Sequence, residues 1–340
     1  WDQKELPSEE MYATIFNEVM TAEKRQIGKA STRMNYSKSG WKSLIKKSKR
    51  KFKKIKEGPY KEQMIAIDKR WANIEYWKAL GQMVDPITYG YYLNAVDLTY
   101  DSNKNIIQQP EKRRMYNSTW WLTFEISILV TLFCLVLGYP ISYLLATLPL
   151  KWSNLLMICV LLPFWTSLLV RTVSWIVILM QKGIFNSLLV WGGIIADENR
   201  MQLIYNKTGT LIAMTQILLP FMVLPLYSVM KTISPSYMRA GLNLGAQPMH
   251  AFYRIYMPQT VPGISAGGLL VFVLAIGYFI TPELVGGSEG LLIGHFIAYH
   301  LKTTLNWGLC SALGAILLAV MLILYWAYNK IVGIENIKLG

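Results

Sequence analysis

From Thr119 onward the chain contains several apolar stretches, each about long enough to cross a lipid bilayer. A hydrocarbon core about 30 Å thick requires about 20 mostly apolar residues in helical conformation. Each stretch must be helical, because lipid offers no hydrogen-bond partner to a free backbone group. The sequence therefore predicts an all-α membrane protein. The predicted spans cover about 119–148, 153–180, 208–231, 261–282 and 307–330.

One further apolar segment, GIFNSLLVWGGII at 183–195, is too short to span and runs into the polar sequence ADENR. A segment of this length is typical of an interfacial or re-entrant helix. We expect it to lie at the membrane surface or to re-enter the membrane.

Charge divides the chain into two parts. Only 16% of all residues are charged and 53% are hydrophobic, yet residues 1–115 hold 23 of the 34 Lys and Arg and 14 of the 20 Asp and Glu. Nothing in 1–115 is long and apolar enough to span. We therefore predict a polar, basic, mainly helical extramembrane segment over 1–115, followed by a transmembrane domain over 116–335.

The basic run KSLIKKSKRKFKKIK, from Lys42 to Lys56, raises the question of nucleic-acid binding. No zinc spacing or aromatic RNA-binding pattern accompanies the run, and basic segments beside membrane spans commonly contact lipid headgroups or solvent. We therefore expect membrane lipids, and not nucleic acid, among the partners.

Signatures of catalysis are missing from the sequence. It contains no phosphate-binding Walker pattern, no nucleophile elbow and no histidine cluster with metal-ligand spacing. The three cysteines, Cys134, Cys159 and Cys310, lie far apart inside apolar segments. We expect no catalytic residue, no metal site and no cofactor on this chain.

A polar loop at 232–258 lies between two predicted spans and includes TISPSYMRAGLNLGAQPMHAFYRIYMP. Ser234 and Ser236 can cap a helix, Pro235 suits its first turn, and Gly245 permits a tight turn after it. A short helix held between two spans forms a rigid projection that a soluble partner can bind.

RAGLNLGA followed by YRIYMPQTVPG resembles the EAA loop of ABC-importer permeases. Together with LLPFWTSLLVRTVSW, LLPFMVLPLYSVM, ITPELVGG and NWGLCSALG, it is similar to the PotB-type family of spermidine/putrescine permeases over about 119–331. The resemblance implies a type I, MetI-like helical bundle in which a short cytoplasmic helix docks on an ATPase subunit. The ATPase-coupling residues that it implies are Arg239, Ala240, Gly241, Leu244, Gly245, Ala246 and Pro258.

One departure from the family stands in this loop. Where the family usually carries Glu-Ala-Ala, this chain has Arg239, Ala240 and Gly241, so the acidic contact to the ATPase is absent or inverted. Gly245 and Pro258 are kept. Docking is expected, with altered electrostatics.

Topology gives an independent expectation. With five visible spans, the loop at 232–258 reaches the cytoplasm only if residues 1–115 lie outside. The basic residues Lys231, Arg254 and Lys330 then fall on the inner side, which agrees with the positive-inside bias. We expect a first span before Trp1, so that 1–115 is a periplasmic insertion of a multi-pass protein of the bacterial inner membrane.

The resemblance also implies the working partners. These are ATPase subunits that bind ATP and Mg²⁺, a second, related permease chain, and a periplasmic solute-binding protein. The chain itself is expected to form a translocation path for a small cationic solute such as a polyamine. Import of another small solute, such as an amino-acid derivative, and a membrane-anchored interaction protein remain the alternatives.

Ionisable groups at membrane depth usually face a bundle interior or a water-filled cavity. Glu125 can meet a cationic amine there or simply reach the interface, and Glu283 can receive a cation or end a helix. Arg171 lies deeper in its span, and the resemblance implies an Arg at this place, so a structural ion pair or packing is favoured for it. Its charge would also repel a polyamine. Ring faces for an ammonium group are offered by Trp165, Trp175 and Tyr278, although packing or lipid contact also explains them.

Overall fold

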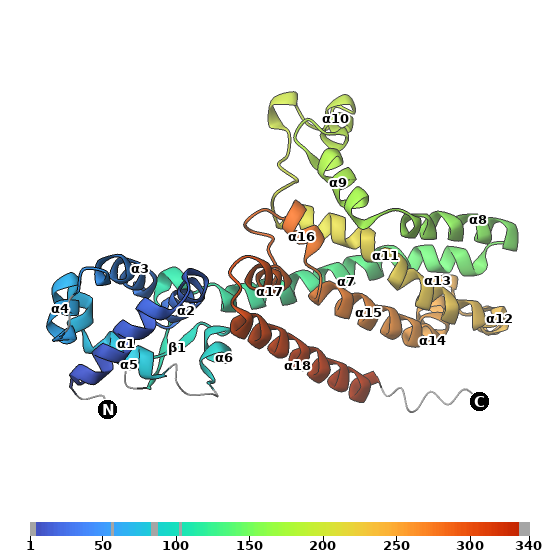
Figure 1. The fold of residues 1–340 in the computed structure, drawn as a ribbon. Coiled ribbons are helices and arrows are strands. Elements are labelled where there is room, and N and C mark those ends of the chain that lie inside the picture. Colours follow the sequence, from blue (N-terminus) through green and yellow to red (C-terminus); the bar gives the residue numbers. More distant parts are fainter. Residues whose placement is uncertain (1–4, 56–57, 83–87, 102–103, 333–340) are drawn as a thin grey trace. The chain divides into compact units, whose positions relative to one another are not determined.

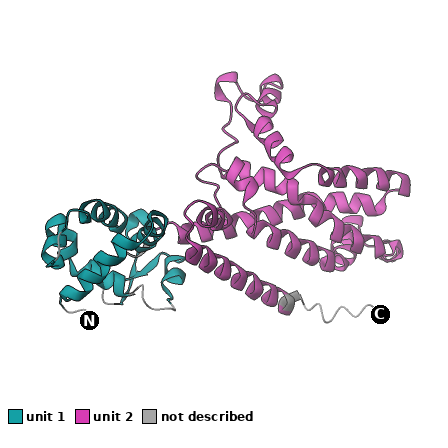
Figure 2. Cartoon of the chain, in the orientation of Figure 1, with its two compact units in different colours: residues 1–113 teal, residues 114–340 magenta. Residues whose placement is uncertain are grey.

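The structure is a computed structural model that describes residues 5–55, 58–82, 88–101 and 104–332. It divides the chain into two compact units, residues 1–113 and residues 114–340 (Figure 2). Each unit has its own hydrophobic core. The predicted end of the membrane domain at residue 335 lies outside the described residues.

Unit 1 is mainly helical, as its polar, amphipathic sequence predicts, and it adds a small antiparallel hairpin in which Leu98 pairs with Gln108. Its core is aromatic, with Tyr12, Trp41 and Trp71 almost completely buried. The elements are α1 (Glu9–Thr21), α2 (Lys24–Ser37), α3 (Trp41–Phe52), α4 (Tyr60–Ile67), η1 (Lys69–Ala72), α5 (Ile74–Gln82), α6 (Gly90–Asn94), β1 (Leu98–Tyr100), β2 (Ile106–Gln108) and η2 (Glu111–Arg113).

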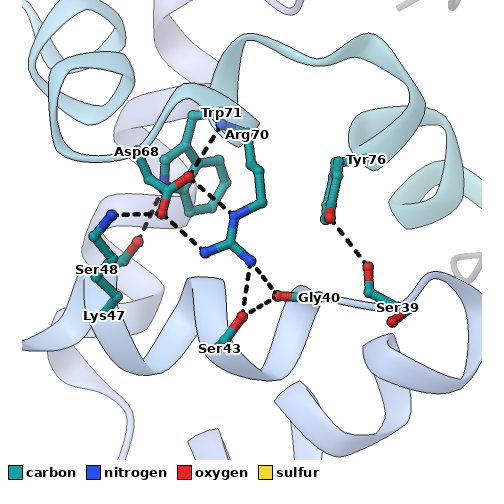
Figure 3. Close-up of polar contacts among 9 residues, drawn as sticks. All are labelled: Ser39, Gly40, Ser43, Lys47, Ser48, Asp68, Arg70, Trp71 and Tyr76. Atoms are coloured by element: carbon teal, nitrogen blue, oxygen red, sulfur yellow. Dashed lines mark hydrogen bonds and ion pairs between the residues drawn. The ribbon is translucent and has the colours of Figure 1, made fainter.

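A polar network ties α3 to the turn that begins η1 (Figure 3). The Asp68 carboxylate accepts hydrogen bonds from Arg70 Nε and Nη2, both at 2.9 Å, and from Lys47 Nζ at 2.8 Å. These donors hold the pKa of Asp68 well below its usual value, with the Arg70 hydrogen bonds as the largest cause. Beside it, the indole of Trp71 donates to Ser48 Oγ at 3.0 Å. The network fixes the buried Trp71 against α3.

All described secondary-structure elements of unit 2 are helices (Figure 1). Its elements are α7 (Tyr116–Thr147), α8 (Leu150–Leu161), η3 (Leu162–Trp165), α9 (Leu168–Leu179), α10 (Ile184–Trp191), η4 (Asp197–Asn199), α11 (Lys207–Thr232), α12 (Pro235–Asn243), α13 (Pro248–Ala251), the π-helix η5 (Phe252–Tyr256), α14 (Met257–Gln259), α15 (Val261–Ile276), α16 (Ile280–Val285), α17 (Ile293–Lys302) and α18 (Trp307–Val332).

Four described helical segments are long and apolar enough to cross a membrane, and α13–α14 with α15 make a fifth if that pair, bent by 60°, counts as one span. α7, α11 and α18 overlap the expected spans 119–148, 208–231 and 307–330. The fourth segment, Leu168–Trp191, combines α9 and α10.

Two of the expected spans differ from the structure. Residues 153–180 form α8 and α9 instead of one helix, because Pro163 lies in a 3₁₀ turn and Thr166 is extended. The expected span 261–282 ends earlier, at Ile276, where Gly277 caps the helix. The short segment 183–195, expected to be an interfacial or re-entrant helix, forms α10, which joins α9 in the fourth candidate span.

The core of unit 2 is a packed trio of helices, α7, α11 and α15. Helices α7 and α11 run parallel, since Cys134 Sγ donates to the Thr215 carbonyl oxygen at 3.4 Å and Ser142 Oγ to the Val223 carbonyl oxygen at 3.2 Å, both 81 residues apart. Helix α15 runs antiparallel to α11, with Gly263 beside Leu226 and Gly267 beside Met222. Glycine allows these close approaches, as is usual between membrane helices.

Candidate functional site

The segment Ser234–Gln259 emerges after α11 and returns to the bundle at α15. Ser234 caps α12 by accepting from the Ser236 backbone N–H, and Pro235 occupies the first turn. Gly245 ends the helix with a positive φ of 89°, a conformation in which glycine lacks the strain of other residues. The short helix and its turn therefore form as the residue types predict.

Helix α12 packs on the π-helix η5 through a glycine. A β-carbon at Gly241 would lie 2.4 Å from Ile255 Cδ1 and 3.7 Å from the Ala251 β-carbon, so the Ile255 side chain would have to move to admit a side chain at this position. Gly241 thus allows α12 and η5 to pack closely into one piece.

Aromatic side chains fasten this piece to α7. The rings of Phe252 and Tyr256 stack with centroids 5.5 Å apart, and the edge of the Tyr143 ring meets both, at 5.5 and 5.3 Å. Tyr139 adds a hydrogen bond of 3.2 Å to the hydroxyl of Thr260. These packed rings join the segment Ser234–Gln259 to α7.

The outer surface of the segment is open and partly apolar. Leu244 is 89% exposed and Met249 is 66% exposed. Arg239, Ala240 and Pro258 are exposed, and Ala246 is half-buried. The segment presents an apolar tip surrounded by polar groups.

At the opposite end of α7 and α11, two charged side chains meet. Glu125 on α7 pairs with Lys207, the first residue of α11, and both side chains are partly exposed, 40% and 34%. Since α7 and α11 are parallel, this pair is separated from Ser234–Gln259 by most of the length of the bundle. No sequence signal linked Lys207 to Glu125, because only the packing of the two helices makes them neighbours.

The other predicted path residues gather around α9 and α16. Trp175 donates to Gln216 Oε1 on α11 at 3.1 Å, and Arg171 lies close enough to Tyr278 for its charge to act on that hydroxyl. Glu283 faces His295 Nδ1 at 3.6 Å. By contrast, Trp165 stands 82% exposed at the end of η3.

No ion pair of Arg171 occurs within the described residues, and its Nε lacks a hydrogen-bond partner.

The buried His300, on α17, is hydrogen-bonded through both ring nitrogens. His300 bonds through Nε2 to the Tyr116 hydroxyl at 2.8 Å and through Nδ1 to Thr304 at 2.9 Å. Burial, and to a smaller degree His295, lower the pKa of His300. Its ring therefore stays neutral near pH 7 and supports structure. The described residues contain no cluster of three or more potential metal ligands.

Together, the candidate spanning helices and the exposed segment Ser234–Gln259 are features of a membrane transport subunit. The chain belongs to the family of binding-protein-dependent transport system inner membrane components, which matches residues 137–332. It is a multi-pass inner-membrane permease subunit of an ABC importer, and family membership implies that it works with ATPase and binding-protein partners.

Curated relatives agree with this assignment. The spermidine/putrescine transport system permease protein PotB of Salmonella typhimurium strain SL1344 is 37% identical over 214 residues, which covers 62% of this chain and 74% of that protein. PotB of Escherichia coli K12 is 36% identical, over 62% of this chain and 77% of its own length. PotB of Haemophilus influenzae is 34% identical over 64% and 77%. These relatives are transport subunits, which confirms the prediction that the chain is not an enzyme.

Among solved structures, a chain of a bacterial ABC transporter involved in the import of the acidic polysaccharide alginate has a similar fold. The TM-score is 0.56 with 16% sequence identity, over 87% of this chain and 99% of that chain. At this identity the likeness concerns the fold alone. It confirms the predicted fold class of an ABC-importer permease.

Proposed function

We propose that this permease imports a small organic polycation such as spermidine or putrescine, and that α12 couples the bundle to the ATPase. The PotB relatives, at 34–37% identity, support the cargo class. The contacts of the segment Ser234–Gln259 support the coupling role.

A single observation carries the coupling proposal: Leu244 is 89% exposed at the tip of a helix that is otherwise rigidly held. Truncating an apolar anchor of this kind commonly costs a protein interface about 2 kcal/mol, or roughly thirtyfold in affinity. Because Arg239 stands where an acidic residue is usual in the family, Leu244 takes over as the main anchor in the ATPase groove. Arg239 then faces an acidic or neutral part of that groove.

The remaining partners follow from the same proposal. ATP and Mg²⁺ are bound by the ATPase subunits, a second, related permease chain completes the path, and a soluble binding protein delivers the cargo at the end that carries Glu125. Closure of the ATPase pair moves α12 and η5, and the packed rings of Phe252, Tyr256 and Tyr143 pass that movement to α7. The bundle alternates between inward and outward openings.

The test is ATP-driven uptake of labelled putrescine and spermidine by the reconstituted importer. Leu244→Ser should reduce uptake at least tenfold and weaken co-purification of the ATPase subunit, without loss of the chain from the membrane. Ile106→Ser, which changes a 59% exposed side chain on β2, is the matched control and should leave uptake unchanged.

Two results would contradict the proposal separately. Normal uptake and normal ATPase association by the Leu244→Ser importer would remove the coupling role. Uptake of other solutes but of no polyamine by the wild-type importer would remove the cargo class and leave the coupling role intact.

A further inference from the structure

Glu125 is the single carboxylate within the described helices that qualify as membrane spans. Carboxylates inside membrane spans are rare and commonly mark a solute or ion pathway. Here its partner is not a fixed structural cation but Lys207, an ammonium on a flexible four-carbon stem. The chemistry of that partner, a primary ammonium, is also the chemistry of a polyamine terminus.

We infer that Lys207 acts as a built-in competitor for the cargo, occupying at Glu125 the place that a cargo ammonium takes during import. This inference rests on the proposed polyamine cargo and extends it to a named site. The cargo displaces Lys207, which swings into water, and Lys207 returns to Glu125 when the cargo moves on.

The contacts of the pair allow a cargo ammonium to replace Lys207 at Glu125. Glu125 and Lys207 are 40% and 34% exposed, so this chain encloses neither side chain. Lys207 is also the first residue of α11, where the helix dipole disfavours a cation, so little holds its ammonium apart from Glu125 itself. Neither side chain has another side-chain partner within the described residues.

The Asp68 network of unit 1 shows how this chain builds a pair that does not exchange. The Asp68 side chain is 8% exposed and accepts from both Arg70 and Lys47, with several hydrogen bonds in fixed geometry (Figure 3). The Glu125 pair has none of these features. The contrast favours a labile role over a purely structural one.

The position of the pair fits the same role. The parallel packing of α7 and α11 places Glu125 and Lys207 at the end away from Ser234–Gln259, where the cargo arrives from its binding protein under the proposed function. A cation that enters from that side meets at Glu125 the single carboxylate within the described spans.

The size of the effect follows from competition. For an exposed ion pair with a single contact, the equilibrium constant between the paired and the unpaired state is about 1.4–5. Removing the pair should therefore tighten the binding of a competing ammonium about two- to sixfold. Spermidine binding to the purified permease–ATPase complex in neutral detergent, without the binding protein, is the direct measurement. Potassium chloride at matched ionic strength corrects for screening.

Lys207→Gln should tighten spermidine binding about two- to sixfold, and the double variant Glu125→Gln with Lys207→Gln should abolish that gain. Lys207→Arg, which keeps the charge, should stay near wild type. Lys231→Gln removes a lysine at the far end of α11, whose Nζ contacts only the Ala146 carbonyl oxygen among the described residues, and is the matched control. It should not change binding.

Unchanged spermidine binding in Lys207→Gln, or an equal gain in the double variant, would overturn the inference. A loss of thermal stability in Lys207→Gln with no gain in spermidine binding would identify the pair as structural and would also overturn it. Putrescine uptake by the wild-type importer is measured in parallel. Its absence would count against the cargo class itself, whereas normal uptake with unchanged binding would count only against the competitor role.

Discussion

Gly267 on α15 lies so close to Met222 on α11 that a β-carbon on the glycine would stand 2.8 Å from the Met222 sulfur and 3.1 Å from its carbonyl oxygen. The sulfur can move, but the carbonyl belongs to the backbone of the central helix. This contact sets how closely α15 approaches α11.

Gly267→Ala should therefore force α15 away from α11 and lower the free energy of unfolding by about 1–3 kcal/mol, as overpacking does. The neighbouring Gly268 is the matched control, because its nearest neighbour is the Thr131 methyl at 3.9 Å. Thermal unfolding in detergent compares the two variants. Equal midpoints for Gly267→Ala and Gly268→Ala would contradict the close-packing argument.

Gly241→Ala should impair coupling through a clash with one atom, Ile255 Cδ1, which lies 2.4 Å from the position that the new β-carbon would take. Ile255→Val removes that atom, and the single change should cost about 0.5–1.5 kcal/mol. The double variant should recover most of the uptake lost in Gly241→Ala, so the two changes should not be additive. Uptake per assembled importer is the measurement, and strict additivity would rule out the direct contact.

Gly245→Ala should destabilise the end of α12 for a different reason. Its φ of 89° is unfavourable for a β-carbon, at a cost of about 1–2 kcal/mol, although nothing lies within 4 Å of the added methyl group. Gly245→Asn should cost less, because asparagine tolerates this conformation better. Hydrogen exchange of the α12 amides reports the loss, and equal protection in both variants would contradict it.

Gly28, inside α2, is the control for the effect of backbone conformation on a glycine-to-alanine change. Like Gly245, it has open space around it, but its φ is not unusual. Gly28→Ala should stabilise unit 1 by about 0.5–1 kcal/mol, since alanine loses less backbone entropy than glycine in a helix.

The stability of unit 1 should depend on acid pH through Asp68. Because Arg70 and Lys47 lower the pKa of Asp68 in the folded state, its contribution is fully present above the ordinary value near 3.8 and is lost as the pH falls below that value towards the folded pKa. Asp68→Asn should remove about 1.5–3 kcal/mol at neutral pH together with this acid dependence.

Glu75→Gln is the matched control, because Glu75 pairs with Lys38 but its side chain is 53% exposed. A surface pair of this kind contributes at most about 1 kcal/mol. Unfolding of unit 1 followed by near-ultraviolet circular dichroism between about pH 2 and about pH 7, a range that includes the ordinary carboxyl pKa, distinguishes the two. If the Asp68→Asn variant keeps the wild-type acid dependence of its stability, that dependence arises from other carboxylates.

Several features of the fold were predictable from local sequence. Apolar length identified α7, α11 and α18, and the residues Ser234, Pro235 and Gly245 predicted a short capped helix, since capping and turn formation depend on nearest neighbours along the chain. Apolar length failed at 153–180, where one apolar run contains two helices. Hydropathy measures burial in lipid, and it does not register a break at Pro163.

By itself, the sequence determined that this is a helical membrane protein with a basic polar unit and a short projecting helix, because apolar length, charge and capping act over a few turns of chain. Only the tertiary structure decided that Glu125 meets Lys207, that Tyr143 holds Phe252 and Tyr256, and that Gly241 rests on Ile255. The first two of these contacts join residues on helices that are remote in sequence, and the third depends on the turn at Gly245. Each is selected by the packing of the helices and leaves no periodic signal in the residues between.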